Sequence, residues 1–280
     1  MTIGEKIKKL RAGKGLSQSD LAEKLGVSRQ SVTKWETEGG LPEIESLITI
    51  ADTFGVSVDS LVREKMKCFS SIIQYDIDSS KDFEIDLTPA KCVCIEGHDS
   101  EKVRVEVMSD TIESLDSDIK VYIEDRKRKM SVELKRNNDL TDSKCREGLY
   151  IHVMLPRKFI ERIELNTDAE TLCLRHFSTE DIEFGGSAKI VNIKDVHGQA
   201  EMDVRSDCLF RIHDLDGSVE INQMERCSTV EVPEGLVFKA VNAGRKCELS
   251  LGEGIVSNES SEDFIELNGM KNVLRIVRMG

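Results

Sequence analysis

The stretch SQSDLAEKLGVSRQSVTKWE, residues 17–36, constrains the fold more than any other part of the chain. Ser17 and Ser28 are residues that cap helix N-termini, and each precedes a run with helical spacing. Gly26 lies between the two runs, where the chain has to reverse, and glycine accepts the positive φ that a sharp reversal needs. The apolar residues of the two runs are Leu21, Ala22, Leu25, Val32 and Trp35. The pattern therefore predicts two short helices joined by a tight turn.

Helical spacing continues on both sides of this stretch. One apolar stripe precedes it and two follow it. Gly55 is positioned to end the fourth helix and Ser57 to begin a fifth. The stripe residues are Ile3, Ile7 and Leu10, then Leu47, Ile50, Ala51 and Phe54, and finally Val58 and Leu61. Residues 1–65 are therefore predicted to form a domain of five short helices.

Five short helices with these caps and this turn glycine resemble the Cro and lambda-repressor type of helix-turn-helix domain, also called the xenobiotic-response-element family. The resemblance covers about residues 3–63 and includes the Trp-Glu ending of the third helix and the trailing sequence GVSVDSL. It implies a sequence-specific DNA-binding transcriptional regulator, with the recognition helix from Ser28 to Glu36 lying in the major groove.

The resemblance also implies a role for individual side chains. Arg29 suits a bidentate contact to guanine and Gln30 a bidentate contact to adenine. The expected base-contacting residues are Arg29, Gln30, Thr33 and Lys34. The expected phosphate-contacting residues are Ser17, Gln18, Ser28 and Ser31. Arg11 and Glu36 match an internal ion pair of the family, so we expect both to be structural.

Charge is distributed unevenly along the chain. The net charge of the whole chain is −13, yet residues 1–35 carry +5. Residues 36–65 carry −5, and residues 66–280 carry −13. We therefore expect a small basic face that meets DNA phosphates and an acidic body that is kept away from them.

Beyond about residue 65 the apolar pattern changes from helical spacing to alternation, which predicts strands with one buried face. The clearest segments are 83–87, 103–107, 119–123, 130–134 and 150–155. We expect a multi-domain α plus all-β chain. Its parts would be a helix-turn-helix domain at 1–65, a linker at 66–80 and a β-repeat domain at 81–280.

A weak internal repeat runs through the second half of the β region. The apolar residues Leu174, Ile193, Ile212 and Val232 are 19, 19 and 20 residues apart. Gly198 and Gly217 recur at one offset within the repeat. Short strands at this spacing predict the rungs of a β-solenoid or a related two-sheet β-repeat domain. This half resembles a bacterial family named for a proposed adhesin role, whose members are sometimes fused to helix-turn-helix modules.

The sequence predicts no enzyme, cofactor or metal site, because no motif of catalysis or nucleotide binding is present. The eight cysteines are expected to be reduced, buried thiols. Cys92 and Cys94 would share one face of a strand, which leaves a redox or metal role open. His176 and His197 can approach each other on adjacent rungs, but hydrogen-bonded or solvent-facing histidines are the simpler interpretation.

We expect a bacterial, cytoplasmic protein with no membrane segment, which binds double-stranded operator DNA as a homodimer. The β domain would supply oligomerisation, sensing of an unknown effector, or binding of a protein partner. The main alternative is an interaction or scaffold protein whose helical module is a docking adaptor with weak DNA affinity. A self-cleaving peptidase of the phage-repressor type is disfavoured, because the Ala-Gly dipeptide at 243–244 lies far from the expected linker.

Overall fold

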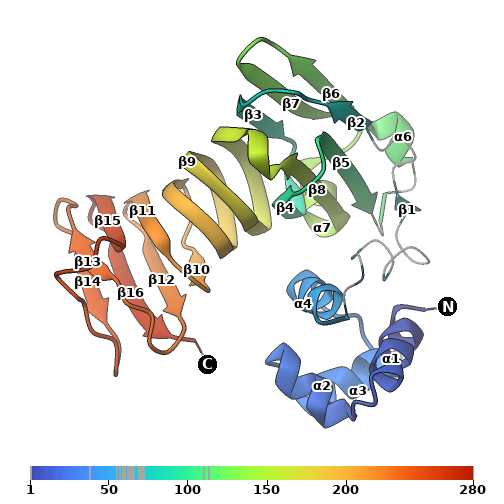
Figure 1. Cartoon of the computed structure of the whole chain (residues 1–280), viewed down its shortest axis with the longest axis horizontal. Coiled ribbons are helices and arrows are strands. Elements are labelled where there is room, and N and C mark those ends of the chain that lie inside the picture. Colours follow the sequence, from blue (N-terminus) through green and yellow to red (C-terminus); the bar gives the residue numbers. More distant parts are fainter. Residues whose placement is uncertain are drawn as a thin grey trace. The chain divides into compact units, whose positions relative to one another are not determined.

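The computed structural model describes residues 2–37, 39–54, 56, 58, 61, 67–68, 73–109, 111–112 and 114–279. The chain forms two compact units, Met1–Cys68 and Phe69–Gly280. The first is helical and the second is dominated by β-strands, which confirms the expected combination of a helical part followed by a β-rich part (Figure 1). Among the described helices, none combines the length and the apolar character that crossing a bilayer requires.

The helical unit contains α1 (Ile3–Gly13), α2 (Gln18–Leu25), α3 (Arg29–Glu36) and α4 (Ile44–Phe54), followed by the short strand β1 (Lys67–Cys68). The predicted apolar stripes form its core, in which Ile7, Val32 and Ile50 are fully buried. Trp35 is 7% exposed, so it belongs to this core. The expected fifth helix lies mostly outside the described residues, although Leu61 is described and buried.

The β unit begins with an end that mixes strands and short helices. Its elements are β2 (Ile73–Asp76), β3 (Lys81–Leu87), β4 (Ala90–His98), β5 (Lys102–Ser109), α6 (Leu115–Asp118), β6 (Ile119–Asp125), β7 (Lys129–Arg136), α7 (Asp142–Gly148), β8 (Leu149–Pro156) and the 3₁₀ turn η1 (Arg157–Phe159). Here β2 pairs with β5, β5 with β8, and β6 with β7, all in antiparallel fashion. The five segments predicted to be strands are strands.

The rest of the β unit is a stack of parallel strands (Figure 1). It comprises the long winding strand β9 (Ile160–Val204), β10 (Leu209–Ile212), β11 (Asp216–Met224), β12 (Cys227–Val232), β13 (Lys239–Asn242), β14 (Glu248–Leu251), β15 (Phe264–Met270) and β16 (Val273–Arg278). Ile193 is in register with Ile212, and Met202 with Ile221, so neighbouring strands are offset by the 19 residues of the predicted repeat. These four side chains are buried in one continuous apolar core.

Glycines allow the backbones of successive turns of the stack to come close together. Gly198 and Gly217 face each other in register and have φ values of 122° and 129°. A Cβ atom on Gly217 would lie 2.1 Å from the carbonyl oxygen of Gly198, and one on Gly198 would lie 1.9 Å from that of Thr179. Any other residue would therefore clash with the turn beneath it.

Two features of the β unit differ from the sequence expectation. Residues 66–80 were expected to be a linker, but β2 lies within them and Ile77 is buried in the core, so the folded β unit starts earlier. Residues 66 and 69–72 of that range lie outside the described residues. Strand β4 was not among the strands predicted from alternation, although Cys92 and Cys94 within it were expected to share one face of a strand; it is buried on both faces for much of its length and so lacks polar–apolar alternation.

Candidate nucleic-acid interface

Two capped helices and a left-handed turn fix the geometry of α2 and α3. The Ser17 side chain accepts a hydrogen bond from the Asp20 amide, and Asp20 Oδ2 accepts one from the Ser17 amide at 2.7 Å. Gly26 ends α2 with φ 65° and ψ 29°, in the left-handed region. Ser28 then begins α3 by accepting a hydrogen bond from the Ser31 amide at 3.0 Å. Local sequence therefore determines where α3 begins and how the chain enters it.

An ion pair between Arg11 and Glu36 ties α1 to the end of α3. Arg11 Nε and Nη2 donate to the two Glu36 oxygens at 2.5 and 2.9 Å, and Nη1 donates to the Leu16 carbonyl at 2.6 Å. The Glu36 side chain is only 2% exposed. Burial raises the pKa of Glu36, but hydrogen bonds from Arg11 and Gln18 outweigh burial, so its pKa lies below the usual value. Glu36 is thus held ionised, and removing either partner would leave a buried charge.

The side chain of Gln18 links this ion pair to the middle of α3. Gln18 Nε2 donates to Glu36 at 2.9 Å, while Thr33 Oγ1 donates to Gln18 Oε1 at 3.0 Å. The sequence singled out Gln18 for a phosphate contact and Thr33 for a base contact. In the structure both side-chain polar groups hold α2 against α3, a role that sequence spacing did not reveal.

The exposed side of α3 carries the side chains that were predicted to read bases. Arg29, Gln30 and Lys34 are exposed and Thr33 is half-buried. We call these four residues the reading face. Together with Gln18 and Thr37 they line one open surface depression. Thr37 was not predicted to be part of it, although it follows Thr33 by four residues and its hydroxyl donates to the Thr33 carbonyl at 2.8 Å.

Among the described residues, no carboxylate neutralises the cations of the reading face. Arg29 and Lys34 are exposed and have no ion-pair partner in the part of the chain that the structure describes, whereas Val32 and Trp35 of the same helix are buried. Ser17 and Ser28 are also exposed, at the N-termini of α2 and α3, and Ser31 is half-buried beside Ser28, with their hydroxyl oxygens 2.9 Å apart. Helix N-termini favour anions, so the basic side chains and the caps present one surface of suitable polarity for phosphates.

The histidine pair of the β unit has a different arrangement. Asp195 lies between His176 and His197, 2.9 Å from His176 Nδ1 and 3.2 Å from His197 Nε2. His197 Nδ1 also lies 2.8 Å from Asp216. Hydrogen bonds in which the carboxylates of Asp216 and Asp195 accept from the His197 ring raise the pKa of His197. The two histidines are therefore bridged by a carboxylate, as hydrogen-bonded residues of a surface ladder.

Comparison with known proteins places the helical unit in a recognised class. Residues 7–61 match the family model described as Helix-turn-helix, so the chain carries a helix-turn-helix domain at its N-terminus. It is 47% identical over 62 residues to the HTH-type transcriptional activator BcrR of Enterococcus faecalis, which covers 22% of this chain and 30% of that protein. It is 36% identical over 61 residues to the cryptic phage CTXphi transcriptional repressor RstR of Vibrio cholerae, which covers 22% of this chain and 54% of that protein.

The chain thus spans about a third to a half of the length of these two relatives, and each alignment covers 22% of this chain. Solved structures resemble the β part only loosely. A proposed cell adhesion protein from Clostridium sporogenes aligns with 77% of this chain and 99% of its own, at 11% identity and a TM-score of 0.37. A proposed adhesin from Bacteroides fragilis aligns with 75% and 98%, at 13% identity and a TM-score of 0.33.

Proposed function

Since residues 7–61 form a helix-turn-helix domain, we propose that the chain is a sequence-specific DNA-binding transcriptional regulator that inserts α3 into the major groove. The single observation that carries this proposal is the reading face of α3. Its cations Arg29 and Lys34 are exposed and have no ion-pair partner among the described residues, while Val32 and Trp35 on the same helix are buried. Two transcriptional regulators, one named as an activator and one as a repressor, are similar to this chain.

The chemistry of the reading face fits direct readout of bases. Arg29 can donate two hydrogen bonds to guanine O6 and N7, and Gln30 can pair with adenine N6 and N7. Lys34, one turn further along α3, reaches a base or a phosphate. Thr33 uses its hydroxyl to hold Gln18, so its methyl group is the part that remains for contact with a thymine methyl.

Backbone groups at the helix N-termini complete the proposed contact with DNA. The hydroxyls of Ser17, Ser28 and Ser31 are placed beside the first turns of α2 and α3, where amide groups lack helical partners. Because the Gln18 side chain is held by Glu36 and Thr33, its phosphate contact would come from its backbone amide, or its side chain would have to leave that network on binding.

Selection of bound duplexes from a random pool, followed by single substitutions, tests the proposal. We expect Arg29→Ala to weaken binding to the selected site by about 1–3 kcal/mol and to relax base preference at one position. Arg162→Ala serves as the matched control, because Arg162 is an exposed arginine of the β unit that is paired with Asp181. Unchanged affinity of both Arg29→Ala and Gln30→Ala at fixed salt would exclude the proposed base contacts.

We further propose that the β unit joins two chains, since one recognition helix reads only a few base pairs and paired half-sites raise affinity and specificity together. The support comes from the C-terminal end of the stack. Within the described sheet, β14 is hydrogen-bonded only to β16, so one of its edges is unpaired. Three large apolar side chains near that end are more than a third exposed: Val237, Leu251 and Val256. An unpaired strand edge beside apolar side chains is suited to pairing with a second copy.

Light scattering during size-exclusion chromatography tests the proposed pairing. We expect the chain to be a dimer and Leu251→Lys to be a monomer with unchanged far-UV circular dichroism. Tyr122→Lys is a matched control, because Tyr122 is 52% exposed on β6, far from β14 in the order of strands. A dimer that survives Leu251→Lys and Val256→Lys together would place the contact elsewhere.

The rival function is an interaction protein whose helical unit has little affinity for DNA. The acidic β unit favours it, since residues 66–280 carry the whole excess of negative charge. A salt titration with random duplex separates the two functions, because phosphate contacts make affinity fall steeply as salt rises. Lack of binding at low salt would favour the rival and reject DNA binding.

A further inference from the structure

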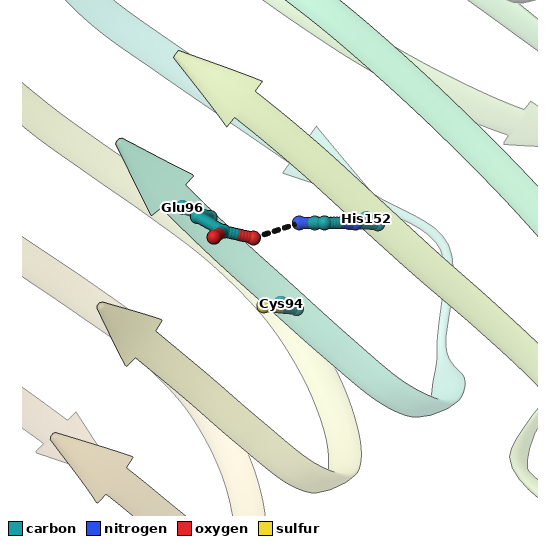
Figure 2. A group of neighbouring side chains, drawn as sticks. All are labelled: Cys94, Glu96 and His152. Atoms are coloured by element: carbon teal, nitrogen blue, oxygen red, sulfur yellow. Dashed lines mark hydrogen bonds and ion pairs between the residues drawn. The ribbon is translucent and has the colours of Figure 1, made fainter. Parts of the chain in front are cut away.

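Three side chains with different metal-binding atoms meet on one face of the sheet in the β unit. Strands β4 and β8 run parallel, with Cys94 directly opposite His152. Val93 and Ile95 point into the core and are fully buried, so Cys94 and Glu96 lie on the opposite face of β4. Figure 2 shows Glu96 and His152 pointing toward each other, with Cys94 beside them on the same strand as Glu96.

The distances among these side chains are close to those around a bound metal. The Cys94 sulfur, a Glu96 oxygen and a His152 nitrogen all lie within 4.8 Å of one another. Ligands of a tetrahedral zinc ion stand about 3.3–3.8 Å apart, because zinc bonds are about 2.0–2.3 Å long. A shift of about 1 Å in side chains alone would therefore complete the arrangement. We propose that Cys94, Glu96 and His152 form a binding site for a divalent zinc-class ion.

The donor set narrows the class of ion. Thiolate and imidazole together suit zinc and its neighbours among the transition metals, whereas magnesium and calcium prefer oxygen ligands alone. Three protein ligands leave a fourth position for water or another ligand. This proposal does not depend on DNA binding, since the residues belong to the β unit.

Neighbouring groups hold the Glu96 carboxylate in place, and the same contacts compete with a metal ion for its ligand atoms. Arg175 on β9 is in register with Glu96 and donates to its Oε2 at 2.9 Å, and His152 Nε2 lies 2.7 Å from the same oxygen. An ion can bind Oε1 while Arg175 keeps Oε2, which is how outer partners commonly fix a ligand carboxylate. Burial lowers the pKa of His152, but its contacts with Cys94 and Glu96 raise it overall to about 10. The ion must displace that proton. An ordinary ion-pair network of His152, Glu96 and Arg175 is thus the competing interpretation.

Cobalt titration of the full-length, chelator-treated chain distinguishes a metal site from an ion-pair network. We expect one Co²⁺ per chain, a near-ultraviolet band from thiolate-to-cobalt charge transfer, and loss of that band when Zn²⁺ is added. Cys94→Ser should remove the band, and His152→Gln should weaken binding at least about tenfold. Cys227→Ser and His98→Gln are matched controls, since Cys227 is exposed, His98 is half-buried and both lie outside the cluster, and we expect affinity within about twofold of the parent chain.

Folding of each variant is checked by circular dichroism before titration. Should Cys94→Ser fail to fold, the parent chain and His152→Gln still decide the matter through thermal unfolding, because an ion that binds only the folded state raises Tm. We then expect Zn²⁺ to raise the Tm of the parent chain more than that of His152→Gln at the same Zn²⁺ concentration. A parent chain with no charge-transfer band, a band that survives in folded Cys94→Ser, or equal Tm shifts in both chains would overturn the proposal.

Discussion

The two units of this molecule differ in whether their surface cations are paired with carboxylates. In the β unit, cations are commonly paired with carboxylates on the neighbouring turn of the stack, as Arg162 is with Asp181 and Lys189 with Glu170, each 19 residues apart. In the helical unit the buried pair of Arg11 and Glu36 holds the helices together. Arg29, at the N-terminal end of α3, has no partner among the described residues.

This difference indicates where a charged ligand can bind. A surface cation that already has a carboxylate partner gains little from meeting a phosphate, because the existing pair must first be broken. An unpaired cation on a rigid helix incurs no such cost. The same repeat that builds the β unit also pairs surface cations with carboxylates, although the unit as a whole stays acidic, whereas Arg29 and Lys34 of the helical unit have no such partner among the described residues.

The largest expected effect concerns the close packing that sets the register of the stack. In Gly217→Ala, the added Cβ atom would lie 2.1 Å from the Gly198 carbonyl oxygen, at a φ of 129° that alanine rarely adopts. We expect the β unit to lose about 4 kcal/mol or more of unfolding free energy, or to fail to fold. Urea unfolding followed by tryptophan fluorescence, which reports on Trp35 in the helical unit, and by circular dichroism separates the two units.

Gly235→Ala is the matched control for Gly217→Ala. Gly235 also has a positive φ, 82°, but an added Cβ atom there would meet nothing within 4 Å. We expect a smaller loss than at Gly217, limited to the strain of the backbone. Equal losses at the two glycines would mean that close packing of successive turns contributes little to stability.

The second largest effect concerns the ion pair that holds α3. Glu36→Ala leaves the Arg11 guanidinium half-buried without its partner and frees the amide of Gln18. We expect the helical unit to lose about 3 kcal/mol of unfolding free energy, the lower end of the range for breaking a buried pair. The Trp35 fluorescence transition in urea measures it. Glu170→Ala, which removes the partner of the largely exposed Lys189, should cost less than about 1 kcal/mol.

In both units, features encoded by residues close together in the chain could be predicted from the sequence, and features that depend on packing between distant residues could not. In the helical unit, the caps Ser17 and Ser28, the turn at Gly26 and the apolar side with Trp35 are encoded within a few residues of where they act, so they could be predicted. The link from Thr33 through Gln18 to Glu36 could not, because it depends on how two helices pack. Thr37 was missed for a similar reason, since it lies just past the end of α3.

In the β unit the regular parts were predictable and the exceptional parts were not. The spacing of Ile193 and Ile212 anticipated the 19-residue offset between neighbouring strands. Strand β4 has apolar residues on both faces, so it gave no alternation. The meeting of Cys94 with His152 needs the register of two strands 58 residues apart in sequence, which no local pattern encodes.

The third effect tests the contrast between free and paired cations directly. Arg29→Ala is expected to cost about 1–3 kcal/mol in affinity for a selected site, while Lys34→Ala should reduce the slope of log affinity against log salt by about 1 if Lys34 binds a phosphate. Lys189→Ala, which removes a paired cation of the β unit, should change neither quantity. Fluorescence anisotropy at several salt concentrations measures all three. If Lys189→Ala lost as much DNA affinity as Arg29→Ala, an ion pair with a carboxylate would not prevent a surface cation from binding DNA.

The smallest expected effect is the dependence of the stability of the helical unit on pH. The pKa of Glu36 is lowered in the folded state, so its ionised form favours folding above the unfolded value of about 4.3. That contribution to the free energy of unfolding is lost as the pH falls through the pKa of Glu36 in the folded state. It cannot exceed the loss of unfolding free energy expected for Glu36→Ala. Asp20 behaves in the same direction, because hydrogen bonds with Ser17 lower its pKa. Urea midpoints of the Trp35 transition from pH 7 down to pH 3 should therefore fall less steeply in Glu36→Gln than in the parent chain, with Asp20→Asn as the comparison. If Glu36→Gln followed the parent curve throughout, the buried pair would not be the acid-sensitive contact that holds α3.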